Sequence, residues 1–214
     1  MNKDLIEHLY SWPKVYIFLS DLQILLQGKS PNALRSIIKR ATQKGYLLRL
    51  KRDLYLIPKR LEQAPPNTLE LAPLLYGPSY ISFESALSYH GWIPEAVMAT
   101  TSACIKRTKE FASPVGFFSY LHIPASIYSV GIKQISSGPV TLFIADPWKA
   151  LADLSYSKKR FWASIKDLEK DLRIEPESLN TSDKQLLHFL STNYPHQKIQ
   201  ETLQFLEKEL SHDY

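Results

Sequence analysis

The segment SPNALRSIIKRATQKGYLLRLKRDLYLIP, residues 30–58, carries the clearest structural signals in the chain. Ser30 is a natural helix N-cap, Pro31 suits the first helical position, and Gly45 can follow the last turn. Between these ends, apolar residues recur at the spacing of one helical face, and polar and basic residues occupy the other. The apolar stripe comprises Leu34, Ile37, Ile38 and Ala41. The pattern predicts an amphipathic, basic α-helix.

The second half of this segment, GYLLRLKRDLYLIP, predicts a β-hairpin. Two short apolar runs stand on either side of Lys51, Arg52 and Asp53. The tip therefore holds two adjacent cations and no glycine, although glycine most easily relieves a tight turn. Asp53 is the one residue of the tip that a cationic role does not explain.

The residues before this segment predict two shorter helices. KDLIEHLY has apolar residues at helical spacing, and LQILLQ is followed by the helix-breaking Gly28. The order helix, helix, turn, basic helix, hairpin is that of a winged helix-turn-helix. We therefore predict such a domain over residues 1–60. The stretch KRLEQAPPNT, with its paired prolines, predicts a linker over residues 61–70.

The remaining residues, 71–214, predict a mixed α+β domain that ends in helices. Four stretches rich in β-branched and aromatic residues predict a small, mostly antiparallel sheet: AVMATTSACI, VGFFSYLHI, SVGIKQI and VTLFIA. Ser82 is expected to cap a helix before this sheet, and Asp146 to cap one after it. The last helix is expected to carry one apolar face, formed by Ile199, Leu203, Leu206 and Leu210. The fold class predicted for the whole chain is α+β.

Positive charge is concentrated in the N-terminal part. Residues 1–60 contain 12 Lys and Arg against 4 Asp and Glu, whereas residues 61–214 contain 14 against 17. The formal net charge of the chain is +5. A basic domain beside a slightly acidic one indicates that the first meets a polyanion.

The basic helix and the hairpin supply the residues expected to contact DNA. An α-helix fits the major groove, and the tip of a β-ribbon can lie against the phosphate backbone. Arg35 is the best candidate for a guanine edge. A solvated helix face and a hairpin kept soluble by charge would carry similar residues, so that interpretation stays open. The complete predicted set is Ser30, Asn32, Arg35, Ser36, Lys39 and Arg40 on the helix, and Arg49, Lys51 and Arg52 on the hairpin.

Signals for enzymatic chemistry are weak. The six histidines show no HxxxH or HxxE spacing, and no glycine-rich phosphate loop occurs. Ser85 and His90 stand five residues apart on an expected helix, which places them on different faces. Cys104 lies in an apolar, β-prone run, where a buried thiol is the default. We expect no catalytic site, no cofactor and no bound metal.

The sequence also predicts a cytoplasmic location. No apolar run approaches the roughly 18 to 20 residues that a membrane span requires. Asp4 and Glu7 interrupt the N-terminal region where a signal peptide would be apolar. A single cysteine excludes an internal disulfide.

Three stretches together resemble the AbiEi-type antitoxins of bacterial type IV toxin–antitoxin systems. Residues 30–58 resemble the recognition helix and wing of that family. YISFESALSYHGWIPE is similar to the opening of its second domain, and TLFIADPWKALADLSY to a later strand-then-helix signature. Asp53 departs from the pattern, because family members commonly have glycine there.

The resemblance implies a transcriptional repressor that binds inverted repeats upstream of its own operon. It also implies an antitoxin domain that neutralises a nucleotidyltransferase-like toxin, with or without direct contact. A palindromic operator calls for a homodimer or two copies on DNA. Two alternatives stay open. One is a protein-interaction module that keeps the winged domain as a scaffold, and the other is a nuclease or transferase with an appended DNA-binding domain.

Overall fold

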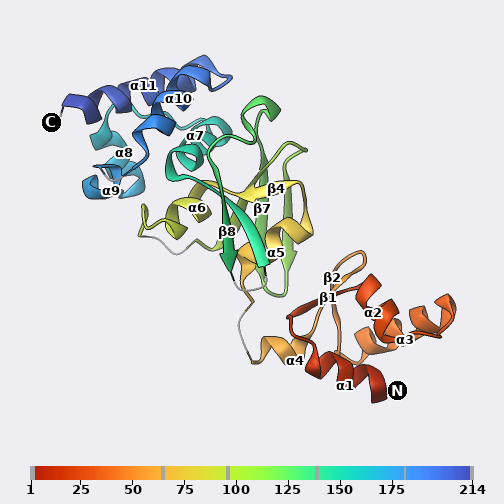
Figure 1. The fold of residues 1–214 in the computed structure, drawn as a ribbon. Coiled ribbons are helices and arrows are strands. Elements are labelled where there is room, and N and C mark those ends of the chain that lie inside the picture. Colours follow the sequence, from red (N-terminus) through yellow and green to blue (C-terminus); the bar gives the residue numbers. More distant parts are fainter. Residues whose placement is uncertain (1–2, 64–65, 95–96, 138–139, 181, 213–214) are drawn as a thin grey trace. The chain divides into compact units, whose positions relative to one another are not determined.

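The structure, a computed structural model, describes residues 3–63, 66–94, 97–137, 140–180 and 182–212 (Figure 1). The chain divides into two compact units, residues 1–67 and residues 68–214. Both contain helices and a sheet, so the fold is mixed α and β. Helix α4 reaches Leu61 and α5 begins at Thr68, so both ends of the predicted linker, 61–70, are helical.

The N-terminal unit combines helices with a three-stranded sheet of order β1-β3-β2. Both strand pairs are antiparallel, and the central strand pairs Tyr55 with Ile17 on one side and with Arg49 on the other. The elements are α1 Lys3–Ser11, β1 Tyr16–Phe18, α2 Leu19–Leu25, α3 Pro31–Gln43, β2 Leu48–Lys51, β3 Leu54–Leu56 and α4 Pro58–Leu61.

Helix α3 forms as the sequence predicts. The backbone amide of Ala33 donates to Ser30 Oγ at 3.3 Å, so Ser30 is the N-cap, and Pro31 opens the first turn. Gly45 follows the helix with a φ of +75°, a conformation that glycine adopts without a Cβ clash. Leu34, Ile38 and Ala41 are buried, as the apolar stripe requires.

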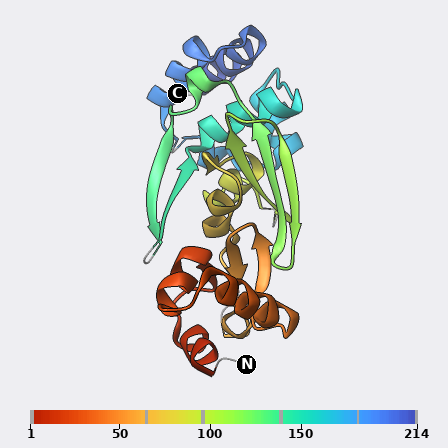
Figure 2. The same ribbon diagram turned by 90° about the vertical axis from the view of Figure 1, so that its right-hand side faces the viewer.

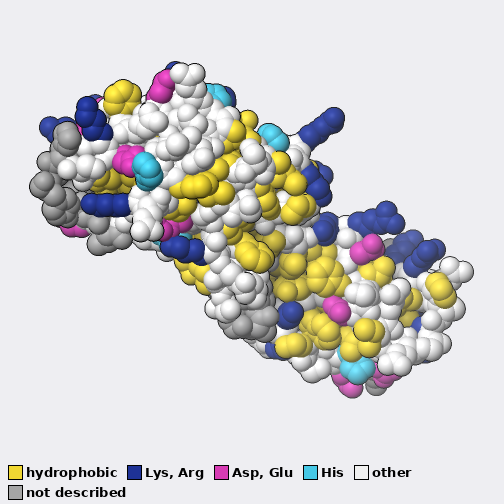
Figure 3. All heavy atoms as spheres, turned by 45° about the horizontal axis from the view of Figure 1, so that its top comes forward, with side chains coloured by type: hydrophobic (Ala, Val, Ile, Leu, Met, Phe, Trp, Pro, Cys, Tyr) yellow, Lys and Arg dark blue, Asp and Glu magenta, His cyan; other side chains and the backbone are white. Residues whose placement is uncertain are grey.

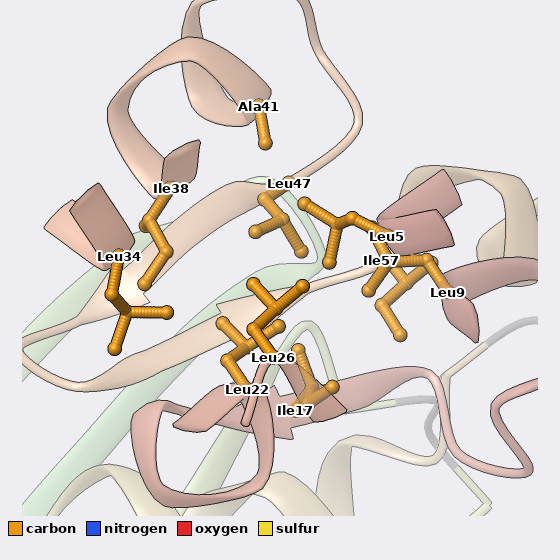
Figure 4. Close-up of a cluster of buried hydrophobic side chains, with 10 residues drawn as sticks. All are labelled: Leu5, Leu9, Ile17, Leu22, Leu26, Leu34, Ile38, Ala41, Leu47 and Ile57. Carbon is orange, nitrogen blue, oxygen red and sulfur yellow. The ribbon is translucent and has the colours of Figure 1, made fainter. Parts of the chain in front are cut away.

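Helices α1, α2 and α3 and strand β1 build the core of this unit, together with residues of the connections. Ten buried residues from the helices, the sheet and their connections point toward one another (Figure 4). They are Leu5, Leu9, Ile17, Leu22, Leu26, Leu34, Ile38, Ala41, Leu47 and Ile57. Because α3 contributes three of them, its polar face is held in a fixed orientation beside the hairpin.

The backbone conformation of the turn between β2 and β3 explains why an aspartate can occupy position 53. Its φ is +60°, the left-handed region that glycine takes most easily and that aspartate tolerates better than most other residues. Its backbone carbonyl accepts a hydrogen bond from the Leu19 amide at 2.9 Å. The turn is therefore joined to the start of α2.

The second unit contains a six-stranded sheet of order β6-β7-β5-β4-β9-β8. Pairs β5–β7 and β4–β9 are parallel and the other three are antiparallel, so the sheet is mixed. The β6–β7 and β8–β9 hairpins form its two edges (Figure 2). The strands are β4 Ser79–Ile81, β5 Ala99–Cys104, β6 Lys109–Ser113, β7 Gly116–His122, β8 Ile132–Ser137 and β9 Val140–Ala145.

Helices surround and follow this sheet. They are α5 Thr68–Leu75, α6 Phe83–Tyr89, the 3-10 turn η1 Ala125–Ile127, α7 Pro147–Lys158, α8 Ile165–Leu172, α9 Pro176–Asn180, α10 Lys184–Asn193 and α11 Gln197–His212. The predicted apolar face of α11 is confirmed, because Ile199, Leu203, Leu206 and Leu210 are all buried. Helices α10 and α11 pack against each other and against α7.

The two predicted caps of this unit have different outcomes. Asp146 caps α7 as expected, since its Oδ1 accepts from the Trp148 amide at 3.1 Å. Ser82 occupies the predicted N-cap position of α6, but its side chain makes no capping hydrogen bond. Its hydroxyl instead donates to Asp153 at 2.9 Å, because burial places a carboxylate within its reach.

Candidate nucleic-acid interface

A groove of about 650 Å³ lies between α3 and the β2–β3 hairpin. Its floor includes Ile38, which belongs to the core, and the half-buried Tyr55 of the central strand. The complete lining is Leu19, Arg35, Ile38, Lys39, Thr42, Gln43, Arg49, Arg52, Asp53 and Tyr55. The groove is concave, and its walls are fixed by elements that share one core.

Four cations converge on this groove. Arg35 and Lys39 stand one helical turn apart on α3, while Arg49 and Arg52 come from the hairpin. All four are exposed. Figure 3 shows Lys and Arg side chains gathered along one side of this unit. Cations held around a concave surface raise the local concentration of anions.

Asp53 is the one carboxylate among the lining residues described here. Its Oδ2 lies 3.6 Å from Arg52 Nε, and both side chains are exposed, at 56% and 89%. An ion pair in solvent contributes little to stability and exchanges readily. Arg52 is therefore available to a phosphate that approaches the tip.

Not all predicted contact residues line the groove. Ser30 Oγ is occupied by the Ala33 amide, and Arg40 Nε donates to the Ser36 carbonyl at 3.2 Å. Asn32, Ser36 and Arg40 are exposed on α3, outside the lining. Lys51 ends β2 opposite Leu54 and is half-buried. The structure thus brings four of the nine predicted residues, Arg35, Lys39, Arg49 and Arg52, to one place.

Sequence reasoning missed three polar residues of the lining: Thr42, Gln43 and Tyr55. Gln43 follows Lys39 by four residues, so the helical period alone could have identified it. Thr42 Oγ1 donates to the Ile38 carbonyl at 3.0 Å, so its hydroxyl can act only as an acceptor toward a ligand. Tyr55 could not be assigned, because its position depends on how the hairpin packs beside α3.

A second, smaller hollow of about 210 Å³ adjoins the turn between α2 and α3. Arg35 lines both hollows, and Lys29, Gln23 and Gln27 add polar side chains. Its complete lining is Leu19, Gln23, Leu26, Gln27, Gly28, Lys29, Pro31, Leu34 and Arg35. The polar surface therefore continues from the groove to the start of α3.

The second unit holds a buried polar cluster around Asp153. Lys149 Nζ donates to Asp153 Oδ1 and, at 2.7 Å, to the Tyr80 hydroxyl. Tyr80 and Ser82 donate to Asp153 Oδ2 at 2.7 and 2.9 Å, and Tyr194 donates to Oδ1 at 3.3 Å. Burial raises the pKa of Tyr80, and Asp153 raises it further. Lys149 and Asp153 are fully buried, so this cluster joins α7 to β4 and to the α10–α11 connection.

The residues considered as catalytic candidates in the sequence do not form a catalytic arrangement. Ser85 Oγ accepts from the Thr101 amide at 2.8 Å, whereas His90 Nε2 lies 2.9 Å from the Ala145 carbonyl. Burial raises the pKa of the Cys104 thiol. Within the described ranges, no three His, Cys, Asp or Glu side chains are grouped so that they could hold a metal ion. Among the same residues, no helix combines the length and apolar character needed to cross a bilayer.

Aromatic side chains of the second unit lie both in its core and on its surface. Tyr80, Phe83, Trp92, Phe118 and Tyr120 are buried, as core packing predicts. Tyr89 and Phe117 are exposed at 48% and 62%.

Comparison of the chain with models of protein families finds no match, and comparison with curated proteins finds none either.

Proposed function

We propose that this chain is a sequence-specific DNA-binding repressor whose N-terminal unit is a winged helix-turn-helix. In this proposal α2 and α3 form the helix-turn-helix and the β2–β3 hairpin is the wing. The observation that carries it is the convergence of Arg35, Lys39, Arg49 and Arg52 on one groove between helix and hairpin.

The chemistry of these residues fits the two parts of DNA recognition. Helix α3 enters the major groove, where Arg35 can donate two hydrogen bonds to the O6 and N7 atoms of guanine. Lys39 and Gln43, each one turn further along, contact the next bases or the phosphates. Arg49 and Arg52 contact the phosphate backbone from the wing, which positions the protein without reading sequence.

We further propose that the repressor is an AbiEi-type antitoxin. The support is the resemblance of residues 30–58 and of two stretches in the second unit to that family. The operator would be inverted repeats upstream of its own operon, occupied by a homodimer or by two copies. The second unit would neutralise a nucleotidyltransferase-like toxin.

A gel-shift measurement tests the DNA-binding function on the DNA upstream of the chain's own reading frame. The Lys39→Ala/Arg52→Ala variant should lose at least about tenfold in affinity, since two groove cations are removed. The matched control, Lys44→Ala/Lys59→Ala, removes the same charge from exposed residues that do not line the groove. Equal losses in the two variants would mean that only net charge matters. Weak binding without preference for the upstream DNA would favour the protein-interaction module.

A further inference from the structure

A cavity of about 650 Å³ lies in the second unit, between the α5–β4 connection and the β8–β9 hairpin. Its lining is Pro73, Gly77, Pro78, Ser79, Tyr80, Tyr128, Ser129, Ile132, Gln134 and Phe143. This volume falls within the range of roughly 300 to 1,000 Å³ that holds small organic ligands. The groove proposed to bind DNA shares no residue with it.

Aromatic and aliphatic surfaces form most of the cavity wall. The rings of Tyr80 and Tyr128 lie 5.1 Å apart between centroids and are tilted by 59°. Phe143 is 49% exposed, so part of its ring is open to a ligand. A flat apolar ligand would cover the exposed parts of the Tyr128 and Phe143 rings and remove them from water.

The wall is already held in place. The Tyr80 hydroxyl is fixed by the Lys149 ammonium and by Asp153, each at 2.7 Å. Tyr80 is itself 2% exposed, so its fixed ring supports the half-buried Tyr128 ring from behind. A preformed wall lowers the entropic cost of binding.

The uncharged lining of the cavity favours a neutral ligand. None of the described residues that line the cavity carries a charge. The nearby Lys106 ammonium donates to the Gly77 carbonyl and also lies 5.5 Å from the centre of the Tyr76 ring. A charged ligand would lose hydration in this cavity without gaining a lining counter-ion. Ser129 and Gln134 can instead form hydrogen bonds with a neutral polar group.

We propose that this cavity is a binding site for a neutral, planar aromatic small molecule. Its ring system lies against Tyr128 and Phe143, and its polar substituent faces Ser129 or Gln134. The site is separate from the proposed DNA-binding groove, and it does not depend on that function.

Two related fluorescent probes test the proposal on the full chain. N-phenyl-1-naphthylamine is neutral and carries a planar naphthalene ring, whereas 1-anilinonaphthalene-8-sulfonate adds a sulfonate to the same ring system. The neutral probe should bind saturably with one site per chain, and at least about tenfold more tightly than the sulfonate. Absence of saturable binding, or equal affinity for the two probes, would overturn the proposal.

Variants locate the probe in the cavity. Ser129→Trp places a large ring in the cavity and should abolish binding, while Phe143→Ser should weaken it at least about fivefold by removing wall area. Phe117→Ser is the matched control, because Phe117 is an exposed phenylalanine of the same sheet outside the lining. Circular dichroism establishes that each variant is folded.

Unchanged probe affinity in both cavity variants would refute the site. Light scattering measures the oligomeric state and so tests whether a second copy of the chain, instead of a small molecule, covers the cavity. If Ser129→Trp converts a wild-type dimer to a monomer, a second copy of the chain covers the cavity and the small-molecule proposal fails.

Discussion

The Leu19 amide donates a 2.9 Å hydrogen bond to the Asp53 carbonyl, and this bond joins the first residue of α2 to the turn of the β2–β3 hairpin. Leu19 and Asp53 both line the groove that contains the four cations. The bond therefore limits how far the hairpin can move from the helices. It also gives Asp53 a structural role that its charge does not suggest.

We expect the charge and the conformation of Asp53 to be separable by mutation. Asp53→Asn keeps a residue that tolerates positive φ, so stability should change by less than about 0.5 kcal/mol, while DNA affinity rises as a carboxylate leaves the groove. Asp53→Val should destabilise by about 1–2 kcal/mol, because a β-branched residue is strained at this φ. Urea unfolding and gel shifts measure the two effects. Weaker DNA binding by Asp53→Asn would show that the carboxylate itself contacts the partner.

The N-cap of α3 should be measurable in the same unfolding experiment. Ser30→Ala removes the acceptor of the Ala33 amide and should destabilise by about 1 kcal/mol. Ser36→Ala is the control, since that exposed serine lies inside the same helix and its replacement should change stability by no more than about 0.5 kcal/mol. Similar losses in both variants would contradict the assigned cap.

Helix α3 could be predicted because its signals are local in sequence, whereas the groove depends on contacts between distant segments. The helix-start and helix-stop signals of Ser30, Pro31 and Gly45 act on the backbone next to them. They can therefore be recognised from the sequence alone. The four cations were also identified by their placement on α3 and the hairpin. Tyr55 joins them only through packing, since β3 pairs with β1 across nearly forty residues of chain.

Long-range pairing also limited prediction of the second unit. The parallel pair β4–β9 places Ile81 beside Ile144, and no local pattern encodes that register. Lys149 and Asp153 have the i, i+4 spacing of a solvated helical ion pair. The structure buries both, because Tyr80, Ser82 and Tyr194 come from distant segments to satisfy them.

Breaking this buried pair should be costly. Asp153→Asn leaves the Lys149 ammonium buried without its counter-charge, and we expect a loss of about 3–5 kcal/mol in unfolding free energy. The double variant Lys149→Met/Asp153→Leu removes both charges and should lose less than Asp153→Asn. Denaturant titrations of the two variants check this order. A larger loss in the double variant would show that packing, not charge, dominates.

Acidification should destabilise the second unit through His90. Burial lowers the pKa of His90 below its usual value of 6.5, although the Ala145 hydrogen bond and Asp146 oppose this shift and Lys133 reinforces it. The unfolded state then binds the proton more readily, so stability present above about pH 6.5 falls as the pH drops toward the folded pKa. His90→Gln should flatten this dependence between pH 7.5 and 5.5. An equally steep decline in that variant would assign the effect to other groups.

Salt dependence should distinguish the hairpin cations from the helix cations. Each phosphate that the protein neutralises contributes about 0.9 to the slope of log affinity against log salt. Arg49→Ala/Arg52→Ala should therefore reduce the slope by about 1.8 and weaken all DNA sequences alike. Arg35→Ala should instead lose about 1–3 kcal/mol of binding free energy on the preferred sequence alone, because a bidentate guanine contact discriminates between bases.

Fluorescence anisotropy measures both quantities, with the upstream DNA and a shuffled duplex of equal length at several salt concentrations. If Arg35→Ala weakened the two duplexes equally, Arg35 would be a phosphate contact, and base recognition by α3 would have to come from Lys39 or Gln43.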